Sequence, residues 1–242
     1  MLPNLGAYWY NPFTLKIYDA WVHRFNMNRV WFCPTETVLD PLFRENFSPR
    51  HLDVGVASGY FPSAALAHRA SPPTGGSQVQ QITLMDLSKN SLRKARRRIE
   101  DDHAALTSSG HLSVTTAHGD VLGPVPEELQ GRTFESVSMF NLLHCVPGPQ
   151  DRKNQAFALA ARVLADDGVL VGDTILGWRH HRPWNVLAWF EMAVLGIFGA
   201  FGNWSDTPDV FERGLKNEFG HVETRVVGSV LVFRATKPRR HR

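Results

Sequence analysis

The sequence HLDVGVASGYF, residues 51–61, decides the fold of this chain. A short apolar strand ends near Asp53, and Gly55 and Gly59 bracket the turn that follows it. Because glycine has no Cβ, the backbone can bend sharply there and approach a ligand closely. A helix is predicted from Pro62 to His68, and its unpaired N-terminal amides favour a bound anion. In a doubly wound sheet, such a strand, turn and helix lie at the cofactor crevice.

Two classes of cofactor bind at turns of this kind. The dinucleotide fingerprint requires G-x-G-x-x-G, whereas here the middle position is Ala57 and no third glycine follows at Tyr60-Phe61. The pattern D-x-G-x-A-x-G instead resembles the first motif of class I S-adenosylmethionine-dependent methyltransferases, which is usually D-x-G-x-G-x-G. The resemblance implies four cofactor contacts within this motif: Asp53, Gly55, Ala57 and Gly59. The extra methyl group of Ala57 would crowd the methionine moiety. The alternative is an ordinary strand and turn without a ligand.

A second acid, Asp86, closes the next apolar strand, which is predicted from Gln81 to Asp86. A carboxylate at the tip of that strand can accept hydrogen bonds from both hydroxyls of a ribose. The resemblance implies this role for Asp86, with Leu87 beside it in the cofactor site. The alternative is that Asp86 caps the following helix, a role that Ser88 could also fill.

The resemblance also implies contacts to adenine after a third strand, predicted from Leu112 to Thr116. Asp120 matches an acid that accepts from the adenine amino group, and the backbone N–H of Val121 matches a group that binds the ring. A Gly-Asp pair is also common in ordinary turns. A fourth strand, from Phe134 to Asn141, ends beside the methyl donor in this family, so Asn141 is a further expected cofactor residue.

The turn after the fourth strand reads Asn141-Leu142-Leu143-His144. Nucleic-acid amino methyltransferases carry an Asn/Asp-Pro-Pro-aromatic sequence at this place, so its absence argues against a base-flipping enzyme. His144 is a candidate catalytic base, because its ordinary pKa of about 6.5 suits the deprotonation of a hydroxyl group. The alternative is that His144 packs beside the cofactor or fixes a loop. The basic helix predicted from Ser88 to Ala105 also carries acids, which favours a solvated face over a nucleic-acid contact.

Residues 1–48 are predicted to form a helical lid. In the quinone-methyltransferase-like group that the chain resembles, residues such as Tyr18 cover the cofactor, and Trp21 is an expected substrate contact. Both belong to a helix predicted from Thr14 to Phe25. The alternative is that they form an apolar helix face packed on the sheet. A second helix is predicted from Thr35 to Arg44, with its first residue as the N-cap.

The stretch from Trp184 to Gly202 is apolar except for Asn185 and Glu191. Its length approaches the roughly 20 residues of a membrane span. A charge near the centre of a span costs at least about 2.5 kcal/mol, however, so Glu191 favours a globular lid over an apolar pocket. Contact with a membrane surface is a minor alternative. The expected substrate contacts around this stretch, besides Trp21, are Trp178, His181 and Trp189.

The composition is that of a globular protein, with 43% hydrophobic and 20% charged residues among 242. Two cysteines, Cys33 and Cys145, argue against a disulfide framework, and no metal site is predicted from the sequence. The N-terminus lacks the charged and apolar regions of a signal peptide, so the expected location is the cytoplasm. A net charge of +3 does not by itself indicate nucleic acid.

We expect a single class I methyltransferase domain of the α/β class. Its sheet is predicted to be Rossmann-like, doubly wound and seven-stranded, with a C-terminal hairpin that supplies one antiparallel strand. The cofactor core is expected over residues 49–176, the substrate cap and hairpin over 177–236, and a disordered basic tail over 237–242. The other predicted elements are helices over 151–164 and 206–218, a turn over 166–168, and strands over 169–174, 222–227 and 230–235.

The resemblance implies an enzyme that transfers a methyl group from S-adenosylmethionine, leaving S-adenosylhomocysteine, to an oxygen or nitrogen of an apolar or aromatic small molecule in biosynthesis. The sulfonium already activates the methyl group, so the protein's main task is to orient the acceptor. The alternative is a non-methylating protein on the same fold, such as a cofactor-assisted cyclase or an interaction protein. An RNA methyltransferase is less favoured. The partner is therefore a small molecule, with no integral membrane insertion, and the oligomeric state is left open.

Overall fold

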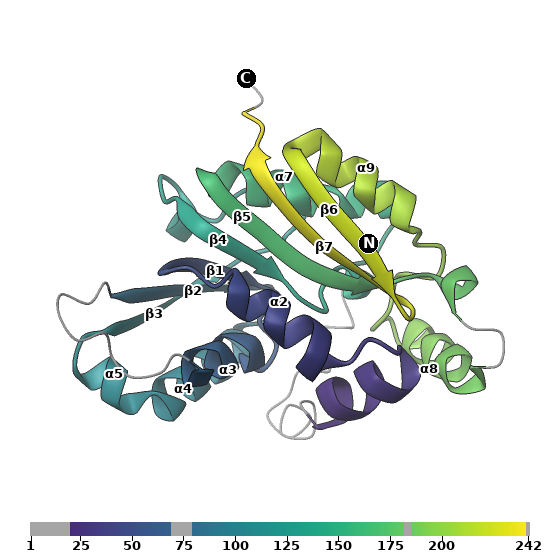
Figure 1. The fold of residues 1–242 in the computed structure, drawn as a ribbon, viewed down its shortest axis with the longest axis horizontal. Helices are drawn as coiled ribbons and strands as arrows, with labels where there is room; N and C mark the ends of the chain where they lie inside the picture. Colours follow the sequence, from purple (N-terminus) through teal and green to yellow (C-terminus); the bar gives the residue numbers. More distant parts are fainter. Residues whose placement is uncertain (1–19, 69–78, 182–184, 241–242) are drawn as a thin grey trace.

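The computed structural model describes residues 20–68, 79–181 and 185–240. Seven strands in these ranges form one sheet with the order β3-β2-β1-β4-β5-β7-β6 (Figure 1). The strands are β1 (Arg50–Val54), β2 (Gln80–Asp86), β3 (Leu112–His118), β4 (Phe134–Met139), β5 (Leu164–Ile175), β6 (Phe219–Val227) and β7 (Val230–Pro238). Strands β1 to β5 pair in parallel, whereas β7 pairs antiparallel with both β5 and β6. The predicted Rossmann-like sheet with one antiparallel strand is confirmed.

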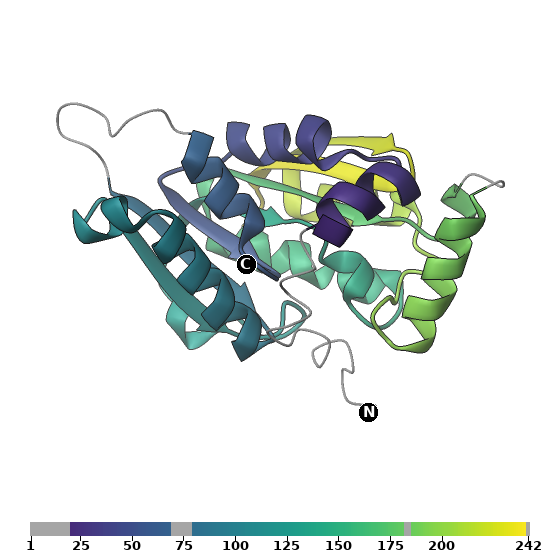
Figure 2. The ribbon, with the colours of Figure 1, turned by 90° about the horizontal axis from the view of Figure 1, so that it is seen from below.

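Helices cover both faces of the sheet. They are η2 (Ala20–Val30), η3 (Thr35–Leu39), α2 (Asp40–Glu45), α3 (Tyr60–His68), α4 (Lys89–Asp102), α5 (Ala104–Ser108), η4 (Glu127–Leu129), η5 (Leu143–Cys145), α6 (Gln150–Lys153), α7 (Gln155–Val163), η6 (Trp178–His180), α8 (Val186–Ile197) and α9 (Pro208–Glu218), where η marks 3₁₀ or π geometry. Figure 1 shows α2 lying across the sheet. Figure 2 shows α3 and α4 beside β2 and β3.

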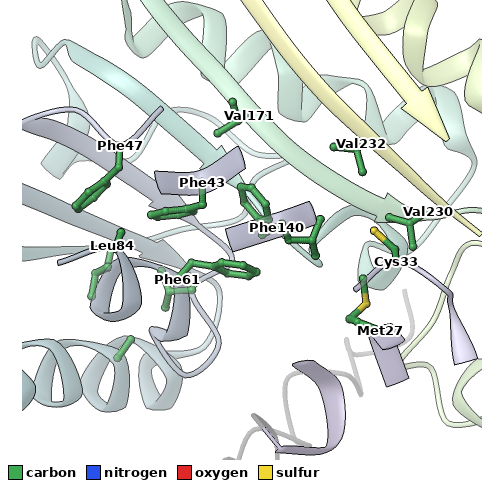
Figure 3. Close-up of a cluster of buried hydrophobic side chains, with 14 of the residues drawn as sticks. Met27, Cys33, Phe43, Phe47, Phe61, Leu84, Phe140, Val171, Val230 and Val232 are labelled. Carbon is green, nitrogen blue, oxygen red and sulfur yellow. The ribbon is translucent and has the colours of Figure 1, made fainter. Parts of the chain in front are cut away.

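The buried apolar side chains form two cores, one on each face of the sheet, because successive side chains of a strand point to opposite faces. Phe43 of α2 and Phe61 of α3 pack with Phe140 on one face, with ring centroids 5.4 and 4.6 Å from that of Phe140 (Figure 3). Phe157 of α7 and Phe211 of α9 belong to the core of the other face. The carboxyl ends of β1 and β4 thus lie beside this aromatic cluster.

Helix α4 shows why its sequence folds as predicted. Ser88 precedes it, and the Ser88 side chain accepts a hydrogen bond of 3.2 Å from the amide of Ser91. That cap confirms that Ser88 can fill the role considered for Asp86. The buried side chains Leu92, Ala95 and Ile99 follow at helical spacing and face the core, while Arg93, Arg96 and Arg97 are exposed.

Several element boundaries differ from the predictions. Thr35 does not cap a helix: Pro34 precedes η3 without a side-chain cap, and the Thr35 hydroxyl is buried inside the first turn. Residues 166–168 are not a turn between elements, because β5 begins at Leu164 and an irregularity in its pairing with β4 absorbs the extra residues. The predicted helix over 151–164 is divided into α6 and α7.

The basic tail is also ordered where the structure describes it. Strand β7 continues to Pro238, and Arg239 and Arg240 are both hydrogen-bonded. The Arg240 guanidinium reaches the carbonyl of Leu164 and the carboxylate of Asp166, each at 2.7 Å. The prediction of disorder is therefore wrong for residues 237–240, because the guanidinium binds carbonyl and carboxylate groups near the end of α7.

Helix α8 lies beside η2 at the end of the sheet toward which the parallel strands point (Figures 1 and 2). The Asn185 side chain accepts from the Ala188 amide at 3.1 Å and donates to the Val30 carbonyl at 2.6 Å. Glu191 is buried and accepts a hydrogen bond from the side chain of Asn26. Within the described ranges, no helix has both the length and the apolar composition needed to cross a bilayer.

Candidate functional site

A pocket opens at the carboxyl ends of β1 and β4, where the strand order of the sheet reverses. In open α/β sheets this reversal is where ligands bind, because the loops after the two strands diverge. The pocket is lined by His23, Asp53, Gly55, Val56, Ala57, Ser58, Tyr60, Phe61, Phe140 and Asn141. Four of the residues predicted to contact a cofactor lie in that set: Asp53, Gly55 and Ala57 of the first motif, together with Asn141.

The backbone of the first motif has left-handed geometry at three positions: φ is +77° at Gly55, +44° at Ala57 and +74° at Gly59. A Cβ at Gly55 would lie 2.7 Å from Leu142, and one at Gly59 would lie 2.9 Å from the backbone of Ala95. These two glycines are required by both conformation and space. Ala57 takes a conformation that costs an L-residue roughly 1–2 kcal/mol, which explains why glycine is usual at this place in the pattern.

Asp53 is buried at the end of β1, and the Ser138 hydroxyl donates a hydrogen bond of 2.5 Å to its Oδ1. Burial raises the pKa of this carboxyl group to about 7, against the lowering effect of the Ser138 hydrogen bond. The negative charge of Asp86 raises the pKa further. The ionisation of Asp53 in the pocket therefore depends on the Ser138 hydrogen bond and on the charge of neighbouring groups.

Asp86 lies at the tip of β2, next to the same loop. Its Oδ1 accepts from the amide of Ser88 at 2.7 Å, and the amides of Val56 and Ala57 also hydrogen-bond the carboxyl group. Burial raises its pKa to about 6, and these three amides oppose the rise. The carboxylate thus ties the second strand end to the first motif.

Asn141 closes β4 with a left-handed conformation, φ +51°, which asparagine tolerates better than most residues. Its backbone amide donates a hydrogen bond of 3.0 Å to Asp173 Oδ1 on β5. Both polar atoms of the Asn141 side chain are buried in the pocket wall without a hydrogen-bond partner among the described residues. A buried amide normally has partners, so this side chain favours a polar ligand in the pocket.

Among the described residues, the remaining predicted cofactor residues do not line this pocket. Asp120 is exposed, and its Oδ1 accepts from the amide of Leu122 at 2.9 Å. Val121 is buried in the core of the other face, and Leu87 is 40% exposed beside Asp86. Tyr18 lies outside the described residues, and for Trp21 only the backbone, within η2, is described.

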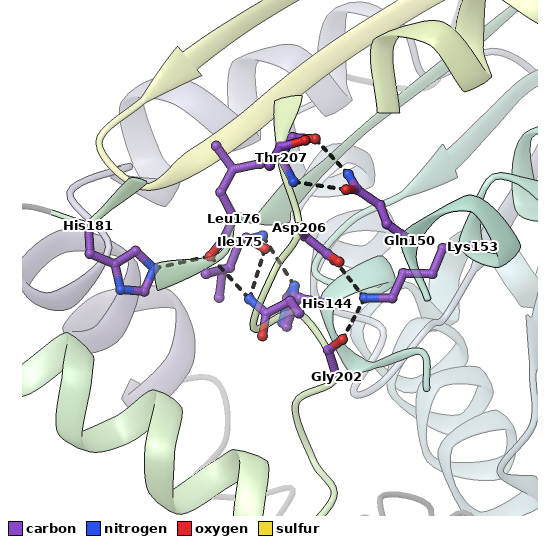
Figure 4. A network of polar contacts seen from close by, with 10 residues as sticks. His144, Gln150, Lys153, Ile175, Leu176, His181, Gly202, Asp206 and Thr207 are labelled. Carbon is purple, nitrogen blue, oxygen red and sulfur yellow. Dashed lines mark hydrogen bonds and ion pairs between the residues drawn. The ribbon is translucent and has the colours of Figure 1, made fainter. Parts of the chain in front are cut away.

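His144 lies in η5, immediately after the β4 turn, and is buried away from the pocket lining (Figure 4). The Ile175 amide donates to its Nδ1 over a long 3.4 Å, and its ring meets Phe201 edge-on with centroids 4.8 Å apart. Burial lowers the pKa of His144 to about 3, helped by the positive charge of Lys153. The ring is therefore neutral at physiological pH, and its role as a catalytic base stays a prediction.

The predicted substrate contacts gather around η6 and α8. The rings of Trp178 and Trp189 lie 5.3 Å apart, and both side chains are half-buried. His181 is buried, with its Nε2 3.0 Å from the Leu176 carbonyl (Figure 4) and its ring 5.3 Å from that of Trp31. These three residues do not line the pocket described above, so their substrate role stays a prediction.

The prediction from the sequence missed the aromatic wall of the pocket. His23 of η2 stacks on Tyr60 with ring centroids 4.2 Å apart, and Phe61 and Phe140 complete the wall. Tyr60 and Phe61 stood in the deciding stretch itself. No local pattern marked His23, because only the path of the chain from η2 back over β1 brings it to the loop.

The donor set of this pocket fits a cationic nucleoside cofactor such as S-adenosylmethionine. Two acids end adjacent strands, two glycines leave space that a Cβ would fill, and the side chain of Asn141 has unused donors and acceptors. Among the described residues, no cluster of three or more His, Cys, Asp or Glu side chains could hold a metal ion.

Comparison with known proteins agrees with this geometry. Residues 52–170 match a family described as a methyltransferase domain. The chain is 40% identical to the O-methyltransferase NEC2 of Pyricularia oryzae, over 96% of this chain and 92% of that protein. It is 38% identical to the physcion biosynthesis cluster O-methyltransferase of Aspergillus chevalieri, over 95% of this chain and 94% of that protein.

Among solved structures, the complex of DhpI with S-adenosylhomocysteine matches 98% of this chain and 97% of that one, with a TM-score of 0.61. At 15% identity, this similarity shows the fold alone. The chain spans 48–63% of the length of several other matching structures.

Proposed function

From the premise that this chain belongs to the S-adenosylmethionine-dependent methyltransferases of class I, we propose that it methylates a hydroxyl oxygen of an apolar, aromatic small molecule. The enzyme class follows from relatives that are 35–40% identical over nearly the whole chain. The acceptor atom and its chemistry form the proposal. One observation carries it: the pocket at the first motif combines a buried acid, Asp53, for a cationic cofactor with an aromatic wall for a flat acceptor.

The cofactor would be held by residues of four strand ends. Asp86 would accept from the ribose hydroxyls, and Asp53 would pair with the ammonium group of the methionine moiety. Asp120 and the amide of Val121 would bind adenine, and the unsatisfied side chain of Asn141 would complete the site near the methyl group. When bound, S-adenosylmethionine supplies an activated methyl group on a sulfonium.

The aromatic wall favours a flat, apolar acceptor. Tyr60, Phe61 and Phe140 present ring surface on one side of the pocket, and His23 stacks on Tyr60. Ring faces and edges of this kind contribute packing energy mainly to aromatic partners. The names of two relatives, both O-methyltransferases and one assigned to a physcion biosynthesis cluster, support an oxygen acceptor over a nitrogen acceptor.

His144 would take the proton of the acceptor hydroxyl. Its ring is neutral, and the Ile175 backbone amide donates to Nδ1 at 3.4 Å, so Nδ1 would take the proton only by releasing that amide. Phe201 packs edge-on against the same ring. The acceptor oxygen would thus gain the methyl group and lose its proton to the imidazole.

The cap, formed by η6 and α8, would close the acceptor side. Trp178 and Trp189 form an aromatic pair there, and the buried Asn185 joins the start of α8 to η2. His181 would fix the cap on the end of β5 through the Leu176 carbonyl. As the resemblance implies, Tyr18 would cover the cofactor and Trp21 would contact the acceptor.

Labelled methyl transfer tests the acceptor class. The purified protein is incubated with methyl-labelled S-adenosylmethionine and matched acceptors: a polycyclic phenol, the corresponding aromatic amine and an aliphatic alcohol. We expect label in a methyl ether of the phenol. Label only in the amine would overturn the oxygen acceptor, and labelling of none, with intact cofactor binding, would overturn the aromatic acceptor. Asp86→Ala, assayed at limiting cofactor, serves as the low-activity reference and Asp101→Ala, on the exposed side of α4, as its matched control.

A further inference from the structure

Strands β1 and β4 carry four polar side chains on one face inside an otherwise apolar core. His51 pairs in register with Ser136, and Asp53 pairs with Ser138. The spacing of two residues in each strand places all four on the same side of the sheet. His51, Ser136 and Ser138 are each at most 1% exposed.

These side chains form one continuous hydrogen-bonded chain. The Ser48 amide donates to Ser136 Oγ at 3.0 Å, and that hydroxyl lies 2.7 Å from His51 Nδ1. His51 Nε2 lies 2.9 Å from Ser138 Oγ, which donates to Asp53 Oδ1 at 2.5 Å. The chain therefore begins at a backbone amide and ends at a carboxyl group in the pocket wall.

The order of the protons follows from the number of donors. Ser138 has one hydroxyl hydrogen and gives it to Asp53, so its oxygen must accept from His51 Nε2–H. In the neutral ring Nδ1 then accepts from the hydroxyl of Ser136, whose oxygen accepts from the Ser48 amide. A charged ring also keeps Nε2–H. The donor to Ser138 thus persists in both protonation states of His51.

The apolar surroundings destabilise this hydrogen-bonded chain unless every buried polar group in it has a partner. Phe43 and Phe47 cover His51, with ring centroids at 5.2 and 4.8 Å. A buried hydroxyl or imidazole without partners costs several kcal/mol in such an apolar cover. Apolar side chains would fill this layer without that risk, so packing alone does not account for polar residues at all four positions.

We propose that His51 and Ser138 are positioning residues of the methyl-transfer site, which through this chain hold the Asp53 carboxylate ionised and oriented toward the ammonium group of the cofactor. The proposal rests on the proposed role of Asp53 in cofactor binding. Hydrogen bonds in such a chain polarise one another, and the carboxylate at its end gains most when it is charged.

Charged and titratable groups reach Asp53 from three elements. Asp86 at the tip of β2 opposes ionisation of Asp53, and the Ser138 hydroxyl from β4 favours it. His51 acts through Ser138, and His23 from η2 lines the same pocket. Because burial already raises the pKa of Asp53 to about 7, loss of the Ser138 donor raises it further. Cofactor affinity then falls most at neutral and lower pH.

Calorimetric titration with S-adenosylhomocysteine from pH 5.5 to 8.5 tests the proposal, because this molecule carries the same ammonium group. In the wild type, affinity should rise as the pH passes through about 7. Ser138→Ala should move that midpoint up by about one unit, the effect of losing one donor to a charged acceptor, and weaken binding about fivefold at pH 7. The loss should shrink at pH 8.5. Ser138→Cys, which keeps the volume and a weak donor, should lie between the two.

Two controls separate the chain from general packing. Thr83→Val removes another buried strand hydroxyl, one paired with Thr115, and should leave the pH midpoint unchanged. The tautomer of His51 can be read in the free protein from long-range proton–nitrogen correlation spectra. We expect hydrogen on Nε2 in the wild type and a changed ring signal in Ser138→Ala.

The outcomes are distinct. If Asp53→Asn binds S-adenosylhomocysteine as tightly as the wild type, the proposed role of Asp53 fails and the positioning proposal with it. If Asp53→Asn loses affinity while Ser138→Ala keeps both the wild-type affinity and midpoint, only the positioning proposal is overturned. A loss in Ser138→Ala that is equal at every pH would assign Ser138 to packing and also overturn it.

Discussion

Lys153 Nζ lies 2.6 Å from Asp206 Oδ2, and neither side chain is more than 2% exposed (Figure 4). The ammonium group also donates to the Gly202 carbonyl at 3.0 Å. The pair therefore joins α6 to the segment that returns from α8, directly beside His144 and Phe201. Because that segment carries the residue that covers His144, the ion pair sets the geometry of one wall of the proposed site.

Asp206→Ala should lower the free energy of unfolding by about 3–5 kcal/mol, because it leaves the Lys153 charge buried and unpaired. The double variant Lys153→Met/Asp206→Leu should recover much of the loss, since it removes both charges. Urea denaturation measures each value. Lys216→Ala, which breaks the exposed pair with Glu212, should cost no more than about 1 kcal/mol. Equal costs for the buried and exposed pairs would contradict the prediction.

Ala57→Gly should stabilise the protein by about 1 kcal/mol, because φ at this position is +44° and glycine reaches that region without strain. Thermal or urea unfolding measures the change. The same substitution at Ala193, exposed in α8, should destabilise by about 1 kcal/mol, since it adds a glycine to a helix. Opposite signs are the decisive result; destabilisation at both positions would show that the left-handed geometry at Ala57 is not maintained.

Stability should also depend on pH through Asp173, which accepts from the Asn141 amide. Burial raises the pKa of Asp173 from an ordinary 3.8 to about 7 in the folded protein. The contribution of such a group is fully present below the unfolded pKa and is lost as the pH rises through the folded one. Asp173→Asn keeps an oxygen acceptor without the charge, so its stability relative to the wild type should rise between about pH 4 and 7.

Urea midpoints at intervals across that range measure the difference between the two proteins. Asp101→Asn, an exposed change on α4, is measured alongside as the control. A constant difference for Asp173→Asn would mean that its carboxyl group is already ionised at low pH in the folded protein.

The sequence predicted the sheet and the ends of its central strands because the decisive signals are local. Asp53 and Asp86 each lie near the end of a predicted strand, and Gly55 and Gly59 mark a turn that other residues cannot make. Parallel strands place their carboxyl ends on one edge of the sheet, so the site at that edge can be predicted from local motifs alone, without distant contacts.

What the sequence did not predict depends on contacts between distant segments. His23 reaches the pocket only through the path of η2, and Arg240 becomes ordered because the carbonyls of Ala161 and Leu164 lie within its reach. The irregularity at residues 164–168 is set by pairing with Phe134. The burial of His144 likewise follows from Phe201, which returns from beyond α8.

Cofactor affinity should depend on Asp86 more than on any neighbouring exposed acid. Asp86→Ala should weaken S-adenosylmethionine binding by about 1.5–3 kcal/mol, the usual value of hydrogen bonds to a charged group. The fold should survive, because Ser88 caps α4 with its own side chain. Titration calorimetry gives the affinity, and Asp101→Ala should bind like the wild type. Unchanged affinity in Asp86→Ala would remove this carboxylate from the proposed site.

The role of His144 separates a catalytic base from a packing residue. If His144 takes the proton of the acceptor, His144→Ala should lower the methylation rate about 10²–10⁴-fold while cofactor affinity stays nearly constant. Because burial lowers the pKa of His144 to about 3, the wild-type rate should show no histidine inflection between pH 5 and 8. Phe201→Leu is the matched control, since it changes the cover of the ring but keeps the imidazole, and its rate should fall far less. Rates at several pH values with saturating cofactor measure both effects. A His144→Ala rate within about threefold of the wild type, with a lowered melting temperature, would assign His144 to the packing of η5 against β5.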